Sequence, residues 1–297
     1  MGLEPEFVER CVMEAVTVDL RSPEDLRRAV RLHDDCPVEG MTPEDYLPRW
    51  VEVPTHGRAL AGIQFRGPGP RKPVLELLQR SFRIDRADTL DDLRRCLRGQ
   101  FAGFHPTAAL VFLTPGEEAA CGAEAPGLPD ERLIGGRLHH LRQRPPPPRP
   151  RQVRLARTFG LDWFDLYRAA YESFHGKASD ALRDAVRVET RETLSHFIEC
   201  GAVFEVFIDD LWAGLVAVLR QTMAGLPGFL VVEEILSPAF IGQRLAPAVQ
   251  DEMIRRLDAD PLDCLFGKIH PLNGPSLRTA MGLGRVDLGG FRALSLV

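Results

Sequence analysis

The sequence has no apolar stretch that approaches the ~20 residues needed to cross a bilayer. Its first residues are acidic and lack the apolar core of a signal peptide, and Glu6 stands where a myristoylation signal needs serine or threonine. Basic charge is not in excess either, because the formal net charge is -5. The sequence therefore predicts neither a membrane partner nor a nucleic-acid partner.

Metal-binding and disulfide patterns are also missing. The six cysteines are scattered without a Cys-x-x-Cys pair, and the eight histidines lack ligand spacing. If the adjacent His139 and His140 lie on a strand, they point to opposite faces and cannot chelate one ion together. We therefore expect no metal site, unpaired thiols and a reducing, cytoplasmic setting.

The length of the chain, 297 residues, predicts two domains of about 150 residues each. The clearest boundary is the segment 144–151, which contains four consecutive prolines. Such prolines lack amide donors and adopt an extended conformation, which favours a semi-rigid linker over a ligand for an SH3-like partner. We expect an N-terminal domain over residues 1–143 and a C-terminal domain over residues 152–297, each folding independently.

The N-terminal half mixes helical and strand patterns. Ser-Pro-Glu-Asp at 22–25 and Thr-Pro-Glu-Asp at 42–45 are typical helix openings, because serine or threonine caps, proline fits the first turn and acids favour the positive end. The predicted strands are 15–20, 59–65, 110–113 and 132–138, and further helices are predicted near 74–79 and 90–97.

Strands and helices alternate more regularly in the C-terminal half, which predicts an α/β fold with a mixed sheet covered on both faces. Tyr167, Tyr171 and Phe174 recur at helical spacing, which is more typical of core than of a cofactor contact. The predicted strands are 152–156, 202–208, 211–219, 229–236, 264–269 and 290–296, and the predicted helices are 163–174, 187–199, 245–257 and 275–281.

The segment 234–246 follows a predicted buried strand and leads into an amphipathic helix. A helix N-terminus has unpaired N–H donors and a positive dipole end, so it attracts phosphate. The element order over 152–297 resembles the GNAT N-acetyltransferase superfamily, in which such a loop holds the pyrophosphate of acetyl-CoA. The resemblance implies acetyl-CoA contacts at Ser237, Gly242, Gln243, Arg244, Leu245 and Ala246.

The loop departs from the family pattern Gln/Arg-x-x-Gly-x-Gly/Ala. Ala246 matches it, whereas Ile241 replaces the polar first residue and Arg244 replaces a glycine. The bulk of Arg244 would hinder close approach of the backbone to pyrophosphate, while its charge would favour a phosphate oxygen. We favour the second interpretation, and a surface arginine at a helix start is the alternative.

The segment 270–285 resembles the family's strand–Asn–helix–Gly motif. The resemblance implies that Asn273 and Ser276 lie beside the thiol arm of CoA, although Asn273 could equally cap a helix beginning near Pro275. Many family members place a tyrosine, the acid for the leaving thiolate, where this chain has Ala280. Another group or water would protonate the thiolate, or the step needs no acid, since a thiol pKa is near ~8.5.

Glu233 and Glu234 are the acidic pair of the predicted buried strand. A carboxylate can take the proton of an attacking amine, and only one of two neighbours on a strand can face the acyl site. The family alignment places Leu230, Val232 and Glu234 on that face, so we expect Glu234 to be the base; a salt-bridged or edge-exposed acid is the alternative. The N–H of Ile235 or Leu236 would polarise the thioester carbonyl.

These patterns together predict an N-acyltransferase that moves an acyl group from CoA to an amine, with acetyl as the expected group. The alternative is a non-catalytic acyl-CoA-binding or regulatory module, which the altered loop and the missing tyrosine favour, and a non-amine acceptor is a third possibility. The N-terminal half begins strand–helix–helix–strand and could be a diverged GNAT-like unit without a phosphate loop. The sequence leaves the small-molecule or protein acceptor and the oligomeric state open.

Overall fold

The structure is a computed structural model that describes the chain except for residues 1–2, 4, 14–22, 67–70, 123–126 and 187. The predicted strand at 15–20 and the predicted helix cap Ser22 lie outside the described residues. The chain forms two compact units, which we call the N-terminal unit (Glu4–Asp130 with Gly289–Val297) and the C-terminal unit (Met1–Leu3 with Glu131–Leu288).

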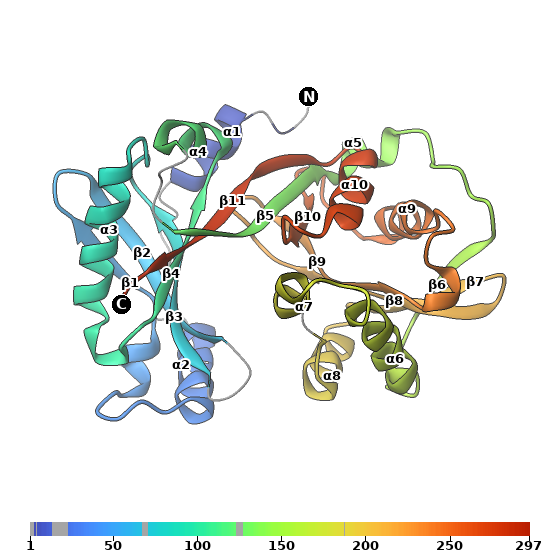
Figure 1. Ribbon diagram of the computed structural model, residues 1–297, viewed down its shortest axis with the longest axis horizontal. Helices are drawn as coiled ribbons and strands as arrows, with labels where there is room; N and C mark the ends of the chain where they lie inside the picture. Colours follow the sequence, from blue (N-terminus) through green and yellow to red (C-terminus); the bar gives the residue numbers. More distant parts are fainter. Residues whose placement is uncertain (1–2, 4, 14–22, 67–70, 123–126, 187) are drawn as a thin grey trace. The chain divides into compact units, whose positions relative to one another are not determined.

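The N-terminal unit is built on a mixed sheet (Figure 1). Strands β1, β2 and β3 are antiparallel, β3 runs parallel to β4, and helix α3 connects the two parallel strands. Its elements are α1 (Pro5–Met13), α2 (Pro23–Asp35), η1 (Pro43–Tyr46), β1 (Arg49–Val53), β2 (Gly57–Arg66), β3 (Lys72–Arg80), α3 (Ala87–Gln100), η2 (Ala102–Phe104), β4 (Ala108–Leu113) and α4 (Pro115–Cys121).

The C-terminal unit repeats this arrangement on a larger scale. Strands β6 to β9 are antiparallel, β9 runs parallel to β10, and helix α9 connects the parallel pair. Its elements are α5 (Leu138–Gln143), β6 (Val153–Arg157), α6 (Phe164–His175), α7 (Asp180–Ala185), α8 (Arg191–Glu199), β7 (Val203–Ile208), β8 (Leu211–Arg220), β9 (Gly228–Leu236), η3 (Pro238–Phe240), α9 (Ala246–Arg256), β10 (Cys264–Ile269) and α10 (Gly274–Gly282).

Helices cover both faces of the sheet in the C-terminal unit (Figure 1). One core cluster joins the α6 side chains Tyr167 and Tyr171 to Leu215 and Ile235 of the sheet. The opposite cluster joins α9 to the other face of the same strands. Strand β9 therefore presents alternate side chains to two different helical layers, as its apolar run requires.

The units do not coincide with the expected domains 1–143 and 152–297. Strand β5 (Leu128–Arg137) precedes the prolines but pairs with β10, whereas β11 (Val286–Ser295) follows β10 in sequence but pairs with β4. Each of these strands continues a sheet that would otherwise stop at an unpaired edge. The prolines at 145–148 are mostly exposed, but the chain on both sides of them belongs to the C-terminal unit.

Most predicted elements of the C-terminal half are confirmed. The hairpin turn at Asp209-Asp210 has positive φ at both residues, which matches the twist of two-residue hairpins. The predicted helix at 74–79 is wrong, because these residues belong to strand β3. A short apolar run with buried residues on both faces does not distinguish a helix from a central strand. His139 and His140 lie on helix α5 rather than on a strand.

Candidate functional site

The loop between β9 and α9 has the features of an anion site. After η3 the chain turns through Gly242 (φ 81°) and Arg244 (φ 57°) before the 11-residue helix α9 begins. Within the described residues, the amides from Gly242 to Ala246 donate to no backbone or side-chain acceptor. They are therefore available to an anion at the positive end of the helix.

Arg244 occupies a left-handed conformation that costs a non-glycine residue about 1–2 kcal/mol. Glycine, which the resembled loop pattern has at this position, adopts this conformation without that cost. The side chain is exposed. Exposure agrees with both interpretations of Arg244, as a phosphate partner and as a surface arginine at a helix start.

Side-chain contacts hold the loop from outside. Arg151 Nε donates to Asp209 at 2.7 Å, and its Nη1 donates to Gln243 Oε1 at 3.3 Å. Gln243 Nε2 in turn donates to the carbonyl of Ala239 at 2.6 Å. Arg149 donates to Asp251 of α9 at 2.8 Å, so the end of the proline-rich segment is bound to the helix that follows the loop. The Gln243 side chain thus shapes the loop.

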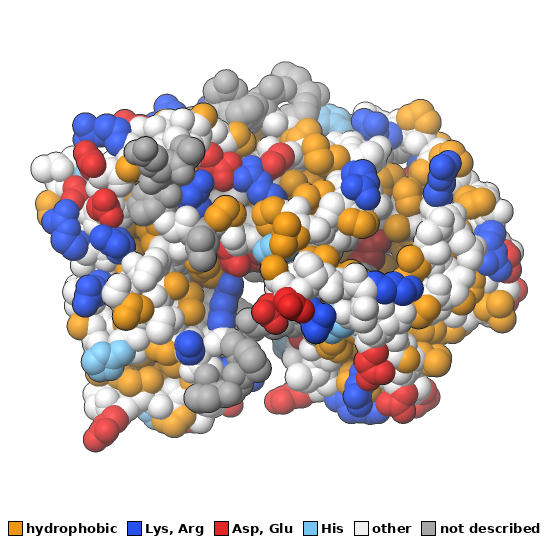
Figure 2. Space-filling model, in the orientation of Figure 1, with side chains coloured by type: hydrophobic (Ala, Val, Ile, Leu, Met, Phe, Trp, Pro, Cys, Tyr) orange, Lys and Arg blue, Asp and Glu red, His pale blue; other side chains and the backbone are white. Residues whose placement is uncertain are grey.

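Strands β9 and β10 separate close to this loop. Their pairing ends at Val231 and Gly267, while β9 continues to pair with β8 as far as Leu236. The later residues of β9, including Ile235 and Leu236, therefore have no partner strand on the β10 side in the described part of the chain. Figure 2 shows a hollow in the surface of this unit, with an acidic side chain recessed in it.

A β-bulge in β9 decides which way its side chains point. Ala217 pairs with Glu233 and Val218 pairs with Val231, which leaves Val232 as the extra residue. Val231 packs with the α9 cluster and Val232 with the α6 cluster. The expectation that Val232 and Glu234 share a face is therefore wrong, because Glu234 contacts α9.

Glu233 points to the opposite face, as expected for neighbours on a strand, and is buried under α6. Tyr167 donates a hydrogen bond to its Oε2 at 2.7 Å, and Tyr171 donates to Oε1. The Tyr167 hydroxyl also accepts the amide of Glu189 at 2.9 Å. Burial raises the pKa of Glu233 to about 7, against the lowering effect of the two tyrosines. Both carboxylate oxygens are engaged.

We expect Glu233→Gln to remove a pH dependence of stability. The pKa is raised from 4.5 to about 7 on folding, so this group's stabilising contribution is complete below about 4.5 and is lost as pH rises through about 7. Glutamine resembles the protonated acid and does not titrate. Urea unfolding at pH 5 and pH 8 should show a smaller loss of unfolding free energy in the variant than in the parent chain; equal losses would contradict the assignment.

Glu234 is half-buried and has one free oxygen. Its Oε2 accepts from the side-chain amide of Gln250, and the Gln250 carbonyl accepts from the guanidinium of Arg285. In the described part of the chain, Oε1 accepts no hydrogen bond. Burial raises the pKa of Glu234, although Arg285 and Gln250 act in the opposite direction.

Asn273 caps α10, as the helix-cap interpretation predicts. Its Oδ1 accepts the amide of Ser276 at 3.4 Å, and both side chains are only partly buried. Ala280 is fully buried and has no group that could donate a proton.

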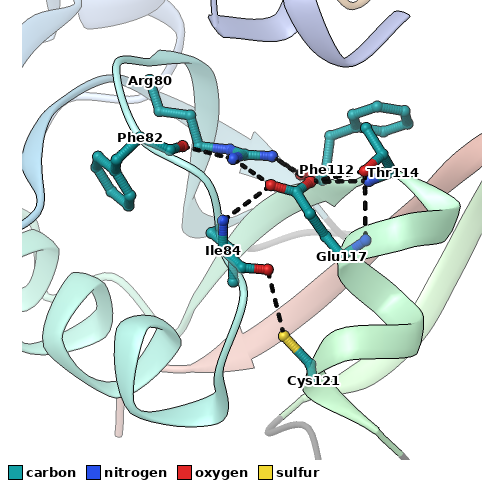
Figure 3. A network of polar contacts seen from close by, with 7 residues as sticks. All are labelled: Arg80, Phe82, Ile84, Phe112, Thr114, Glu117 and Cys121. Atoms are coloured by element: carbon teal, nitrogen blue, oxygen red, sulfur yellow. Dashed lines mark hydrogen bonds and ion pairs between the residues drawn. The ribbon is translucent and has the colours of Figure 1, made fainter. Parts of the chain in front are cut away.

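The corresponding loop of the N-terminal unit, residues 81–86 between β3 and α3, is occupied by a carboxylate from its own chain (Figure 3). Glu117 Oε1 accepts the Ile84 amide at 2.8 Å, and Oε2 accepts the Thr114 amide at 3.0 Å. Arg80 donates to both oxygens at 2.5 and 2.6 Å. Burial alone would raise the pKa of Glu117, but Arg80 and these donors hold it below its usual value.

Sequence reasoning did not find three of these polar side chains. Gln250 and Arg285 are far apart in the sequence, and neither belongs to the motif positions singled out above. Tyr167 lies in the core, as its spacing predicts, but its bond to Glu233 was not foreseen. A signal was present in Gln250, a polar residue within the apolar stripe of α9.

Within the described residues, no group of three or more histidine, cysteine or acidic side chains could hold a metal ion, and no helix is long and apolar enough to cross a membrane.

No protein-family model and no curated protein matches the sequence. Two solved structures align with a TM-score of 0.50. One is a tandem GNAT protein from the clavulanic acid biosynthesis pathway, solved without AcCoA, which is 13% identical over 94% of this chain and 97% of its own. The other is a GNAT-family acetyltransferase from Colwellia psychrerythraea, which is 12% identical over 93% of this chain and 97% of its own. The chain therefore has a GNAT-like α/β fold, and the similarity extends through its N-terminal half.

Proposed function

We propose that the C-terminal unit transfers an acyl group from acyl-CoA to an amine, with acetyl as the expected group. The observation that carries this proposal is the row of free amides from Gly242 to Ala246 beside the point where β9 leaves β10. The free amides suit a pyrophosphate. Where the strands separate, backbone groups of the described residues are left unpaired and can bind the arm of CoA that bears the thioester. The similar structures are a GNAT protein and a GNAT-family acetyltransferase, which supports the same chemistry.

Each residue of the site has a separate role in the proposed reaction. The amine nitrogen attacks the thioester carbonyl, the C–N bond forms as the C–S bond breaks, and CoA leaves as a thiolate. Glu234 takes the proton of the amine through its free oxygen, while the N–H of Ile235 or Leu236 polarises the carbonyl. Asn273 and Ser276 lie on the CoA side. Because thiolate is a good leaving group, Ala280 needs no acidic replacement.

Glu234 suits the role of base better than Glu233. A base must first be within reach of the proton it takes, and only then does its pKa matter. Both oxygens of Glu233 are held by buried tyrosines, whereas Glu234 keeps Oε1 free beyond the last rung between β9 and β10. Glu233 therefore secures α6 to the sheet.

We expect one acyl-CoA molecule to bind per chain, because Glu117 occupies the corresponding loop of the N-terminal unit. Calorimetry with acetyl-CoA should give a stoichiometry of one and a rise in Tm. Gly242→Asp should weaken binding about tenfold by charge repulsion. The matched Gly242→Asn tests shape alone, since both residues tolerate positive φ and no atom lies within 4 Å of the added Cβ.

Two molecules per chain, or equal binding by the two Gly242 variants, would contradict this assignment. If acetyl-CoA does not bind at millimolar concentration, the assignment of acyl-CoA as the acyl donor is overturned. An amine-library screen for CoA release separates the enzyme from the alternative, a module that binds acyl-CoA without turnover. Binding without release for any amine would favour that alternative, to which the altered loop and Ala280 also point.

A further inference from the structure

A buried polar chain connects Glu234 to the far end of α10. Gln250 lies on α9, and Arg285 follows α10 by three residues and is 3% exposed. The Gln250 amide nitrogen donates to Glu234, and its carbonyl oxygen accepts from Arg285. The two charged neighbours therefore fix the orientation of the amide, with its donor toward the carboxylate and its acceptor toward the guanidinium.

Arg285 lies over the place where the parallel strands separate. Its Nη1 is 3.4 Å from the position of a Cβ added at Gly267, the last residue of β10 paired with β9. Its Nε is buried and has no hydrogen-bond partner among the described residues. Burial lowers the pKa of Arg285 to about 10, against the effect of Glu234, so the guanidinium stays charged at neutral pH. A buried, incompletely paired cation is costly unless it serves a nearby anion.

The ion pair of the N-terminal unit provides an internal contrast. Arg80 and Glu117 touch directly, and the carboxylate receives donors on both oxygens, as a structural pair requires (Figure 3). In the C-terminal unit an amide separates the two charges, and Glu234 keeps one oxygen free. The spacing preserves attraction between the charges without consuming the oxygen that a reaction would use.

We infer that Gln250 and Arg285 form a relay that positions the Glu234 carboxylate for proton transfer and keeps it ionised, an inference that rests on the proposed function. Gln250 binds Oε2 and so fixes the carboxylate with its free Oε1 pointing away from Gln250. Arg285 supplies the positive charge that offsets burial of the carboxylate. The only other ionisable neighbour along the strand is Glu233, which points to the α6 face and is bound by tyrosines. Gln250 and Arg285 are positioning residues.

The relay is tested by titrating Glu234 directly in the ligand-free chain. Carboxyl-carbon NMR of the glutamate-labelled protein, with the signal assigned by Glu234→Gln, reports the pKa without needing an acceptor. Arg285→Met and Gln250→Glu should each raise it by about one pH unit, because one removes the positive charge and the other adds a negative one. Arg285→Lys, which keeps the charge, should stay near the parent value.

Activity and binding give the second readout. With an identified amine, the acidic limb of the kcat profile should move upward in pH by the same amount in Arg285→Met and Gln250→Glu, while Kd for acetyl-CoA stays within about twofold. Should Arg285→Met fail to fold, the Glu234 titration is compared between Gln250→Glu, which adds a charge, and the shape-matched Gln250→Met, which does not. An unchanged Glu234 titration in both charge variants overturns the relay. If the titration moves but no amine releases CoA, the relay stands and the proposed function fails.

Discussion

Glu234→Gln is expected to lower the rate of acyl transfer by about 10²- to 10⁴-fold, the usual contribution of a general base. The substitution keeps the shape of the side chain, and its amide oxygen can still accept from Gln250. Affinity for acetyl-CoA should therefore persist. What is lost is the proton acceptor, and the acidic limb of the pH–rate profile should vanish with it.

Glu233→Gln is the matched control, one residue away on the opposite face. Its oxygens bond Tyr167 and Tyr171, so the change should affect stability more than turnover. Single-turnover rates with saturating acetyl-CoA measure both variants. A large rate loss in Glu233→Gln with little in Glu234→Gln would reverse our assignment of the two faces. Normal rates in both would place the base elsewhere or mean that the amine arrives neutral.

Glu117→Gln is expected to cost about 3–5 kcal/mol of unfolding free energy, because it leaves the Arg80 guanidinium buried without a counter-charge. Arg80 and Glu117 are each 1% exposed, so neither group can regain water. The corresponding fall in Tm is roughly 10–17 °C for a unit of this size. Urea unfolding measures the first quantity and calorimetry the second.

Removing both charges should recover only part of this loss. In Arg80→Met with Glu117→Met no charge is left unpaired, but the amides of Ile84 and Thr114 lose their acceptors. The double variant should therefore be more stable than Glu117→Gln and less stable than the parent chain. A loss below about 1 kcal/mol in Glu117→Gln would mean that the pair is not buried as the structure has it.

Local patterns in the sequence predicted the parts of the site that depend on one segment. The start of α9, the cap by Asn273 and the opposed Glu233 and Glu234 all follow from helix-end chemistry or from strand alternation. The bulge at Val232 could not be predicted this way, since it arises from the register with β8.

Long-range partners were invisible for the same reason. Gln250 and Arg285 meet only after α9 and α10 have packed, and the pairing of β5 with β10 joins segments on either side of the prolines. The proline-rich segment was a strong composition signal, yet it contacts α9 within one unit. Composition identifies where a chain is extended but not which strands it lies between.

The pairing of β11 with β4 also imposes an order on folding during translation. The N-terminal unit receives Gly289–Val297 only after the ribosome has made residues 131–288, which belong to the C-terminal unit. Until then β4 presents an open edge, and the high contact order of the missing pairing makes its closure slow. A nascent chain should therefore be prone to aggregation until β11 emerges, and truncations before β11 should aggregate rather than yield a stable N-terminal fragment.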